Sequence, residues 1–226
     1  MDILTLDQLP QDGFAGLKEK RVVTDKRLFG DRKHPKAANG IGSFVYLADA
    51  QFLPYGETGM HPHKEVDVIS VMAKGQVSHK GSLEHGQGLK AGDAQVQRAG
   101  GEGFTHNEVN PDAAPNQLIQ LWVLPEQSGK PAGYKVYQPE EGQRTRIYGG
   151  PSSQNTTFDS HTLIEIFQAS EGQQTRHQGE VLAYLSTGSA TINGVKMDAG
   201  TLIRTNELDF TAHEKSQLIL IFTEDA

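Results

Sequence analysis

Short segments of β-branched and aromatic residues recur along the whole chain, and none of them continues into a long helical period. Segments such as "QLIQLWVL", "TLIEIFQA", "TLIRTN" and "SQLILIFT" have the length and composition of strands. Turn signals separate them, and the 25 glycines and 10 prolines can supply many turns. Many short strands with glycine punctuation predict an all-β fold, either a sandwich or a barrel.

The two halves of the chain carry similar β units. The stretch "AKGQVSHKGSLEHGQGLKAGDAQVQRAG" resembles "STGSATINGVKMDAGTLIRTN" from the second half. Each copy opens a hairpin with a glycine and places an Ala-Gly dipeptide before the next strand. Gly75 therefore aligns with Gly188, and Gly92 aligns with Gly200. The sequence predicts two β units, one after the other.

The composition between these units predicts the domain boundaries. The intervening stretch, "PEQSGKPAGYKVYQPEEGQRTRIYGGPSSQNTT", is rich in Pro, Gly and polar residues, which is typical of a connector with little core of its own. We expect a first domain over residues 1–125, a connector over 126–155 and a second domain over 156–226.

Two histidines stand at the start of the segment "HPHKEVDVIS". Alternate side chains of a strand share one face, so His61 and His63 would project together, about 6–7 Å apart along the backbone. Pro62 lacks an N–H donor, which fits an edge strand or the start of a strand. Taken alone, such a pair is more often two surface histidines than a metal site, because short motifs match by chance.

A second pair changes this interpretation. The stretch "AGGEGFTHNEVN" places His106 and Glu108 one residue apart, again on one face of an expected strand. Together the two pairs offer three imidazoles and one carboxylate. That is a sufficient donor set for a divalent transition metal that keeps open coordination positions. Each pair is weak evidence by itself, and the combination predicts a metal site.

These stretches resemble the two cupin motifs of the pirin family. "GETGMHPHKEVD" is similar to the first motif, and "AGGEGFTHNEVN" is similar to the second. The following "LIQLWVLPEQSGKPAGY" also resembles bacterial pirins. The likeness is close over most of the first half and looser over the second, which looks like a degenerate cupin. The resemblance implies an all-β bicupin, with two consecutive jelly-roll-like β-barrels.

The resemblance also implies the ligands and the cofactor. Members of the family bind one metal, usually iron, in the N-terminal barrel through three histidines and one glutamate. The corresponding residues here are His61, His63, His106 and Glu108. Residue type alone leaves Mn, Ni, Co, Cu and Zn open beside Fe(II), because imidazole and carboxylate suit all of them. Zinc as a structural ion is less favoured, since the donor set leaves coordination positions open.

A second metal site is not expected. The repeat offset places the four residues Gln174, Arg176, Glu214 and Ser216 where the first half has its ligands. Those residues do not form a metal site. A slip of one residue would bring His177 and His213 into play, but it would also turn side chains to the other face.

The other histidines and a basic segment have simpler interpretations. We expect four further histidines to be ordinary surface residues: His34, His79, His85 and His161. The segment 18–36 contains eight Lys or Arg against three acidic residues. Such a run is most often a solvated edge, and the alternative is a docking surface for an acidic protein partner.

Several bacterial pirins are described as quercetin 2,3-dioxygenases, so the resemblance implies an Fe(II)-dependent dioxygenase acting on a flavonol-like enol and O2. A metal held by four protein ligands would keep two octahedral positions for these reactants. Glu108 is the candidate catalytic residue, because a carboxylate that ligates through one oxygen can accept a proton on the other. We expect the walls of the pocket to include Val68, Val96 and Phe104.

The alternative function is regulatory. Some pirins act as iron-binding proteins whose affinity for a protein partner changes with the oxidation state of the iron. For this chain, that would mean no turnover and a partner docking beside the metal.

Composition excludes several other classes of protein. The formal net charge of −7 argues against a general nucleic-acid binder. With no cysteine, the chain can form neither a disulfide framework nor a thiolate site. We find no signal-peptide pattern and no apolar run of about 18 residues, so we expect a cytoplasmic protein without membrane contact.

Overall fold

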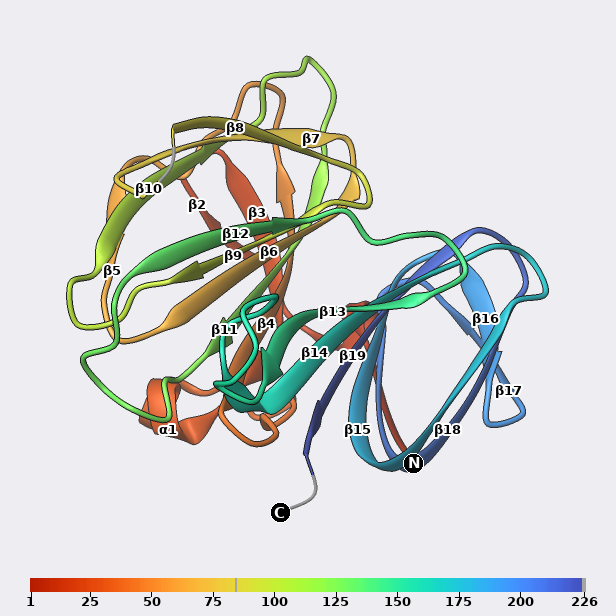
Figure 1. Cartoon of the computed structure of the whole chain (residues 1–226). Coiled ribbons are helices and arrows are strands. Elements are labelled where there is room, and N and C mark those ends of the chain that lie inside the picture. Colours follow the sequence, from red (N-terminus) through yellow and green to blue (C-terminus); the bar gives the residue numbers. More distant parts are fainter. Residues whose placement is uncertain (84, 225–226) are drawn as a thin grey trace. The chain divides into compact units, whose positions relative to one another are not determined.

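The structure is a computed structural model that describes residues 1–83 and 85–224, including their side chains except at 85–87. The chain forms two compact units. One comprises Leu9–Gln138, and the other comprises Met1–Gln8 together with Pro139–Ala226. Both consist almost entirely of strands (Figure 1), which confirms the predicted all-β class. No helix in the described part of the chain is long and apolar enough to cross a membrane.

The unit Leu9–Gln138 contains a seven-stranded and a four-stranded antiparallel sheet. In the order β12-β9-β6-β11-β4-β3-β2, the larger sheet comprises β12 (Gly133–Tyr137), β9 (Ala94–Arg98), β6 (Asp67–Lys74), β11 (Gln117–Val123), β4 (Phe44–Phe52), β3 (Leu17–Thr24) and β2 (Asp12–Phe14). The smaller sheet comprises β5 (His61–His63), β10 (Phe104–Val109), β7 (Gln76–Gly81) and β8 (His85–Lys90). A short helix α1 (Lys26–Phe29) and a 3-10 turn η2 (Gly30–Arg32) connect β3 to β4.

The two sheets of this unit share a core. Met72 from β6 and Leu118 from β11 pack in one cluster with Val77 and Leu89, which come from the hairpin β7–β8. All four side chains are nearly inaccessible to water. Burying such side chains is the main stabilising contribution to a sheet that packs face to face with another. This packing fixes the four-stranded sheet, which carries the predicted metal ligands, against the larger sheet.

The other unit is built on one eight-stranded sheet. Its strands are β1 (Asp2–Thr5), β13 (Arg144–Gly150), β14 (Ser160–Ala169), β15 (Gln174–Thr187), β16 (Ser189–Ile192), β17 (Val195–Asp198), β18 (Thr201–Ala212) and β19 (Ser216–Thr223). Their order is β13-β14-β19-β15-β18-β16-β17, and β1 pairs with β18 beside this path. A 3-10 turn η1 (Leu6–Gln8) follows β1.

Alternation along these strands builds the core of this unit. Val181, Ala183 and Leu185 of β15 are buried in one cluster. Leu218 and Leu220 of β19 join the same cluster with the same spacing of two residues. Because side chains of a strand alternate between faces, this spacing places all of them on one face of the sheet.

The aligned hairpins of the two halves have the same backbone geometry. Gly75 and Gly188 turn from β6 into β7 and from β15 into β16, with φ of 74° and 80°. Gly92 and Gly200 precede β9 and β18, with φ of 96° and 85°. A side chain is disfavoured at such angles, which explains why glycine stands at all four positions. The predicted internal repeat therefore corresponds to β6–β9 and β15–β18.

The observed units differ from the predicted domain boundaries in two respects. The first eight residues belong to the unit that contains the C-terminal half of the chain, because β1 pairs with β18. The stretch 126–155, predicted as a connector, contains β12 and β13. Each lies at the end of a sheet in one of the two units, and Ile147 and Tyr148 of β13 are buried.

Candidate metal centre

The predicted pair His61 and His63 forms the two ends of β5, at the edge of the four-stranded sheet. Pro62 lies between them at this edge, where its missing N–H donor costs no hydrogen bond within the sheet. β5 pairs with β10 so that His61 stands opposite His106. The register between these two strands therefore brings the two histidine motifs together.

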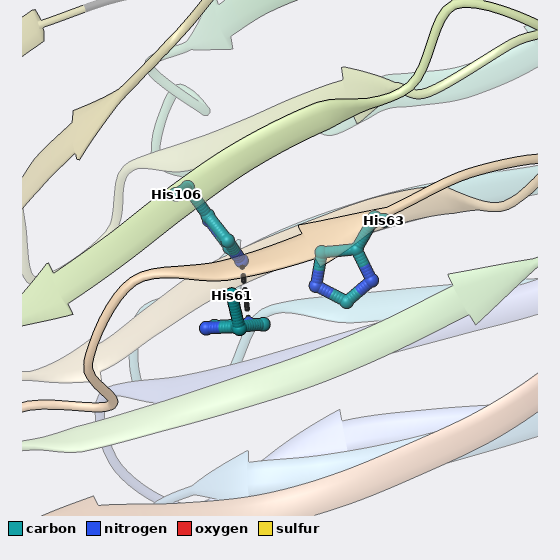
Figure 2. A group of neighbouring side chains, drawn as sticks. All are labelled: His61, His63 and His106. Atoms are coloured by element: carbon teal, nitrogen blue, oxygen red, sulfur yellow. Dashed lines mark hydrogen bonds between the residues drawn. The ribbon is translucent and has the colours of Figure 1, made fainter.

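The three imidazoles point toward one another (Figure 2). Their donor atoms all lie within 4.8 Å of one another, and Nε2 of His106 is 3.0 Å from Nε2 of His61. The ring of His63 lies 4.9 Å from that of His61 and 5.0 Å from that of His106, measured between centroids. Three histidine nitrogens converge here on one small volume.

Glu108 lies next to this group on β10. Its donor oxygen forms a second cluster with His79 and His106, again within 4.8 Å. Ser70 and Gln95 both donate hydrogen bonds to Oε1 of Glu108, at 2.6 and 3.0 Å. The carboxylate is therefore held in place through one oxygen, and Oε2 is the oxygen that a metal can use.

Hydrogen bonds at the outer ring nitrogens orient two of the histidines. Nδ1 of His61 lies 2.9 Å from the carbonyl oxygen of Gly59, so Nδ1–H donates to it and Nε2 keeps its lone pair. Nδ1 of His106 lies 3.1 Å from the amide nitrogen of Gln97, whose amide oxygen is buried without a partner. A half-turn of this amide would place the oxygen against Nδ1–H of His106 and leave its Nε2 as a donor to a metal.

Burial and the repulsion between neighbouring imidazoles lower the pKa values of His63 and His106 and favour their neutral forms. Burial first, and then the neighbouring His61, lower the pKa of His63 to about 4. The same two causes, with smaller contributions from His63 and His79, lower the pKa of His106 further. Burial raises the pKa of Glu108 to about 7, although its hydrogen bonds from Ser70 and Gln95 oppose the rise. Neutral imidazoles with exposed lone pairs are the form in which histidine binds a metal.

A cavity of about 390 Å³ opens beside these side chains in the unit Leu9–Gln138. His61, His63 and Glu108 line one part of it. The walls are largely aromatic and aliphatic, and they include Phe29, Phe52 and Trp122. A mostly apolar pocket of this size with a few converging polar groups is typical of a site for a small molecule.

Comparison with known proteins agrees with this geometry. Residues 17–123, which include all the histidines of this site, match the family model described as Pirin. Residues 17–123 therefore form a Pirin domain. The predicted resemblance is thereby confirmed.

Named relatives and solved structures extend the likeness over the chain. The quercetin 2,3-dioxygenase of Escherichia coli strain K12 is 28% identical over 145 residues, which are 61% of this chain and 62% of that protein. The bacterial pirin YhhW in complex with nickel(II), also from Escherichia coli, has a TM-score of 0.81 at 20% identity and covers 99% of both chains. A quercetin 2,3-dioxygenase from Acinetobacter baumannii has a TM-score of 0.70 at 18% identity, over 99% of this chain and 86% of its own. These structures show that the fold is that of the pirin bicupins.

His79 is the main correction among the other histidines. It was predicted to lie on the surface, but it is completely buried. Its ring lies 5.4 Å from that of His106 and 5.6 Å from that of Tyr134. The hairpin β7–β8 folds over the site, and the alternation of Val77 and His79 places both side chains inward. That alternation was the signal in the sequence.

The remaining surface predictions have mixed outcomes. His161 is exposed, as predicted, whereas His34 is partly buried. The side chain of His85 lies outside the described part of the chain. The predicted pocket walls are also corrected: Val68 and Phe104 pack in a cluster of their own, and neither they nor Val96 line the cavity.

Strand register identifies the positions in the second unit that are equivalent to the site. In the first unit, Glu108 pairs with His79, the fourth residue after Gly75. In the second unit, Phe210 pairs with Ile192, the fourth residue after Gly188. His106 stands two residues before Glu108 and pairs with His61. Leu208 stands two residues before Phe210 and pairs with His177. In the second unit, the apolar side chains of Leu208 and Phe210 therefore stand where the first unit has the imidazole of His106 and the carboxylate of Glu108.

The predicted offset between the two halves is therefore wrong for the site positions. The offset ignored the loops between β5 and β6 and between β9 and β10, whereas β15 and β18 each run without interruption over the corresponding part of the second unit. His177 packs its ring against that of Phe222, and His213 bonds to the hydroxyl of Thr191. In the described part of the second unit, these two histidines belong to no cluster of metal-binding side chains.

Two of the eight basic residues in the segment 18–36 form ion pairs within the same unit. Arg21 pairs with Glu19 and Asp12, and Arg27 pairs with Asp25. Lys33 donates to backbone carbonyl groups. These contacts favour the interpretation of a structural edge over that of a docking surface.

Proposed function

We propose that this pirin-family protein is a metal-dependent dioxygenase of the quercetin 2,3-dioxygenase type. In this proposal, one divalent transition metal is bound by His61, His63, His106 and Glu108. The observation that supports it best is the convergence of three imidazoles, two of which line a cavity suited to an aromatic molecule. The relative from Escherichia coli named quercetin 2,3-dioxygenase supports the choice of reaction.

The residues present fit a metal ion. Without a cation between them, two imidazole nitrogens 3.0 Å apart require that one carries a proton that the other accepts. A metal would replace that proton and bind both lone pairs. The buried amide oxygen of Gln97 gains a hydrogen bond from Nδ1–H of His106 only in the tautomer that offers Nε2 to a metal. Fe(II) is the metal we favour, and Mn, Ni, Co, Cu and Zn fit the same donors.

When bound, the metal would supply a centre at which an enol and O2 are brought together and electrons pass between them. The chain supplies binding, orientation and proton transfer. The apolar walls of the cavity exclude water from the reacting groups. The hydrogen bonds to His61 and Glu108 hold both side chains in a fixed orientation.

Glu108 is the proposed proton acceptor. Its pKa of about 7 is close to neutral pH, where a carboxylate is most effective at both accepting and releasing a proton. Because Ser70 and Gln95 donate to Oε1, a metal would bind Oε2, and the proton would be taken up at Oε1 with the Ser70 hydroxyl turned to accept it. If Glu108→Gln protein that still binds metal turned over at the wild-type rate, this role would be excluded.

Oxygen uptake tests the proposed activity. Protein loaded anaerobically with Fe(II) is mixed with quercetin in aerated buffer, and oxygen consumption and carbon monoxide release are followed together. We expect both to be lost in His63→Ala and retained in His177→Ala, which changes the histidine at the equivalent edge of the second unit. Iron-loaded wild type that consumes no oxygen would contradict the proposal and favour the regulatory alternative.

A further inference from the structure

Three polar side chains lie together in the wall of the cavity, away from the histidines along the chain. They are Glu19 and Arg21 on β3 and Tyr46 on β4. Tyr46 donates its hydroxyl to Oε2 of Glu19 at 3.1 Å, and Nε of Arg21 donates to Oε1 at 2.8 Å. Leu17, Glu19 and Arg21 alternate along β3, so the strand presents a carboxylate and a guanidinium where its pattern would otherwise place apolar side chains.

A row of aromatic rings connects this group to the metal centre. The ring of His63 lies 5.6 Å from that of Trp122, and the ring of Trp122 lies 4.5 Å from that of Tyr46. All three residues line the cavity. The polar group is therefore two ring contacts away from the histidines. A planar ligand with several rings, lying along this row, can reach both ends.

Glu19 is a strong acceptor with unused capacity. Its side chain is only 5% exposed, and burying a carboxylate is costly unless hydrogen bonds compensate for the lost water. An ionised carboxylate offers about four lone-pair directions. Tyr46 and Arg21 use two of them. The guanidinium of Arg21 pairs with this carboxylate at 2.8 Å, so a donor entering the cavity would meet an acceptor in a charge-assisted hydrogen bond network.

We propose that Glu19, Arg21 and Tyr46 form a subsite that binds a hydroxyl group at the distal end of a polycyclic phenolic ligand whose proximal end lies at the histidines. The inference rests on the proposed function for the proximal end. The ligand hydroxyl donates to Glu19, and the aromatic row stacks against the ring system between the two ends. The subsite thus selects hydroxylated flavonols over their deoxy analogues.

Binding under anaerobic conditions tests this without turnover. The probes are 3-hydroxyflavone, 3,7-dihydroxyflavone and 3,4′-dihydroxyflavone, which share the metal-binding end and differ by one distal hydroxyl. Titration calorimetry of metal-loaded protein measures their Kd values, with Trp122, the single tryptophan, as a fluorescent reporter in the cavity wall. We expect at least one dihydroxyflavone to bind about 10- to 100-fold more tightly than 3-hydroxyflavone, as for a hydrogen bond to a charged group.

Two variants and a matched control locate the preference. Glu19→Gln keeps the shape and removes the charge, whereas Glu19→Asp keeps the charge and withdraws it by one methylene. We expect both to reduce the preference to less than about threefold. Asp12→Asn is the control: it neutralises the other carboxylate paired with Arg21, but Asp12 does not line this cavity. It should leave the preference unchanged. Thermal denaturation and metal content establish that each variant is folded and loaded.

The outcomes separate this inference from the proposed activity. Equal binding of all three probes, binding of none, or an unchanged preference in both Glu19 variants would overturn the subsite. A preference lost in the Glu19 variants and kept in Asp12→Asn would support it. Either result stands whatever the oxygen assay gives, because no turnover takes place in the titration.

Discussion

Gln97 determines which nitrogen of His106 faces the other histidines. Its amide contacts Nδ1 of His106 at 3.1 Å, on the side away from the proposed metal. Residues that orient a metal-binding histidine in this way typically contribute about 10- to 100-fold to metal affinity. We expect Gln97→Ala to weaken Ni(II) binding by that factor, measured by calorimetry on metal-free protein. Gln117→Ala, which removes an amide bonded to Asp49, is the control, and an equal loss there would contradict this role.

The affinity for metal should depend on pH through Glu108. Its pKa of about 7 lies above the ordinary value of a glutamate, so a proton competes with the metal below that pH. Apparent affinity should therefore rise as pH increases through 7, and it should fall by up to about tenfold per unit below 7. His63, with a pKa near 4, stays neutral across this range. Ni(II) titrations at pH 6, 7 and 8 should show a shallower dependence in Glu108→Gln, and parallel slopes would refute the assignment.

The sequence predicts individual site residues where spacing reveals a shared face. His61, His63 and His106 were found in this way, because side chains two residues apart in a strand point to the same face of the sheet. Their ligand roles, with that of Glu108, stay a prediction. Glu19 was missed because its place in the cavity depends on a strand that approaches from elsewhere in the sequence, whereas the alternation of Val77 and His79 did indicate an inward His79. Local spacing carries no information on which strand covers which cavity.

Two glycines in hairpin turns of the second unit allow the cost of backbone strain to be measured separately from the cost of side-chain crowding. Gly188 and Gly194 both have φ of 80°. A Cβ on Gly188 would lie 2.2 Å from Oγ of Ser216, whereas a Cβ on Gly194 would meet nothing within 4 Å. We expect Gly194→Ala to cost about 1 kcal/mol in unfolding free energy and Gly188→Ala about 1–3 kcal/mol more. Urea denaturation of both variants measures the difference, and equal costs would mean that the Ser216 side chain and the backbone at Lys215, whose oxygen lies 2.5 Å away, both move aside without penalty.

Turns and strands could be predicted where the residue types within the segment itself determine its backbone conformation. The repeat was visible because a glycine at each hairpin start reflects positive φ, a property of one residue. The stretch 126–155 was predicted as a connector, yet it contains β12 and β13. Both lie at the end of a sheet, where only one neighbour has to be paired and fewer apolar residues are needed. Edge strands of this composition cannot be distinguished from loops by pattern alone.

At the scale of the whole molecule, one of the two units is assembled from both ends of the chain. The first eight residues belong with the C-terminal half, since β1 pairs with β18 from Asp2–Arg204 to Thr5–Thr201. Such a long-range pairing leaves no mark in local sequence, which explains why a boundary before residue 9 was not predicted.

Removal of residues 1–8 should therefore act on the C-terminal unit. Residues 201–204 lie between β1 and β15, so only the alternate amides that face β1 lose their partners, and we expect the hydrogen exchange of these amides to accelerate about tenfold or more. The stretch 210–212 of the same strand pairs with β16 and serves as the internal control. Exchange measured by mass spectrometry should show little change in β6 and β11. Unaltered exchange at 201–204 would mean that β1 contributes little to this sheet.

The most direct test of the central claim is a titration of metal-free protein with Co(II), followed through its visible absorption. We predict one equivalent per chain, a spectrum of imidazole and carboxylate coordination, loss of binding in His106→Ala and full binding in His177→Ala. Tight binding that survives His106→Ala, or a stoichiometry of two, would contradict a single metal centre at these side chains.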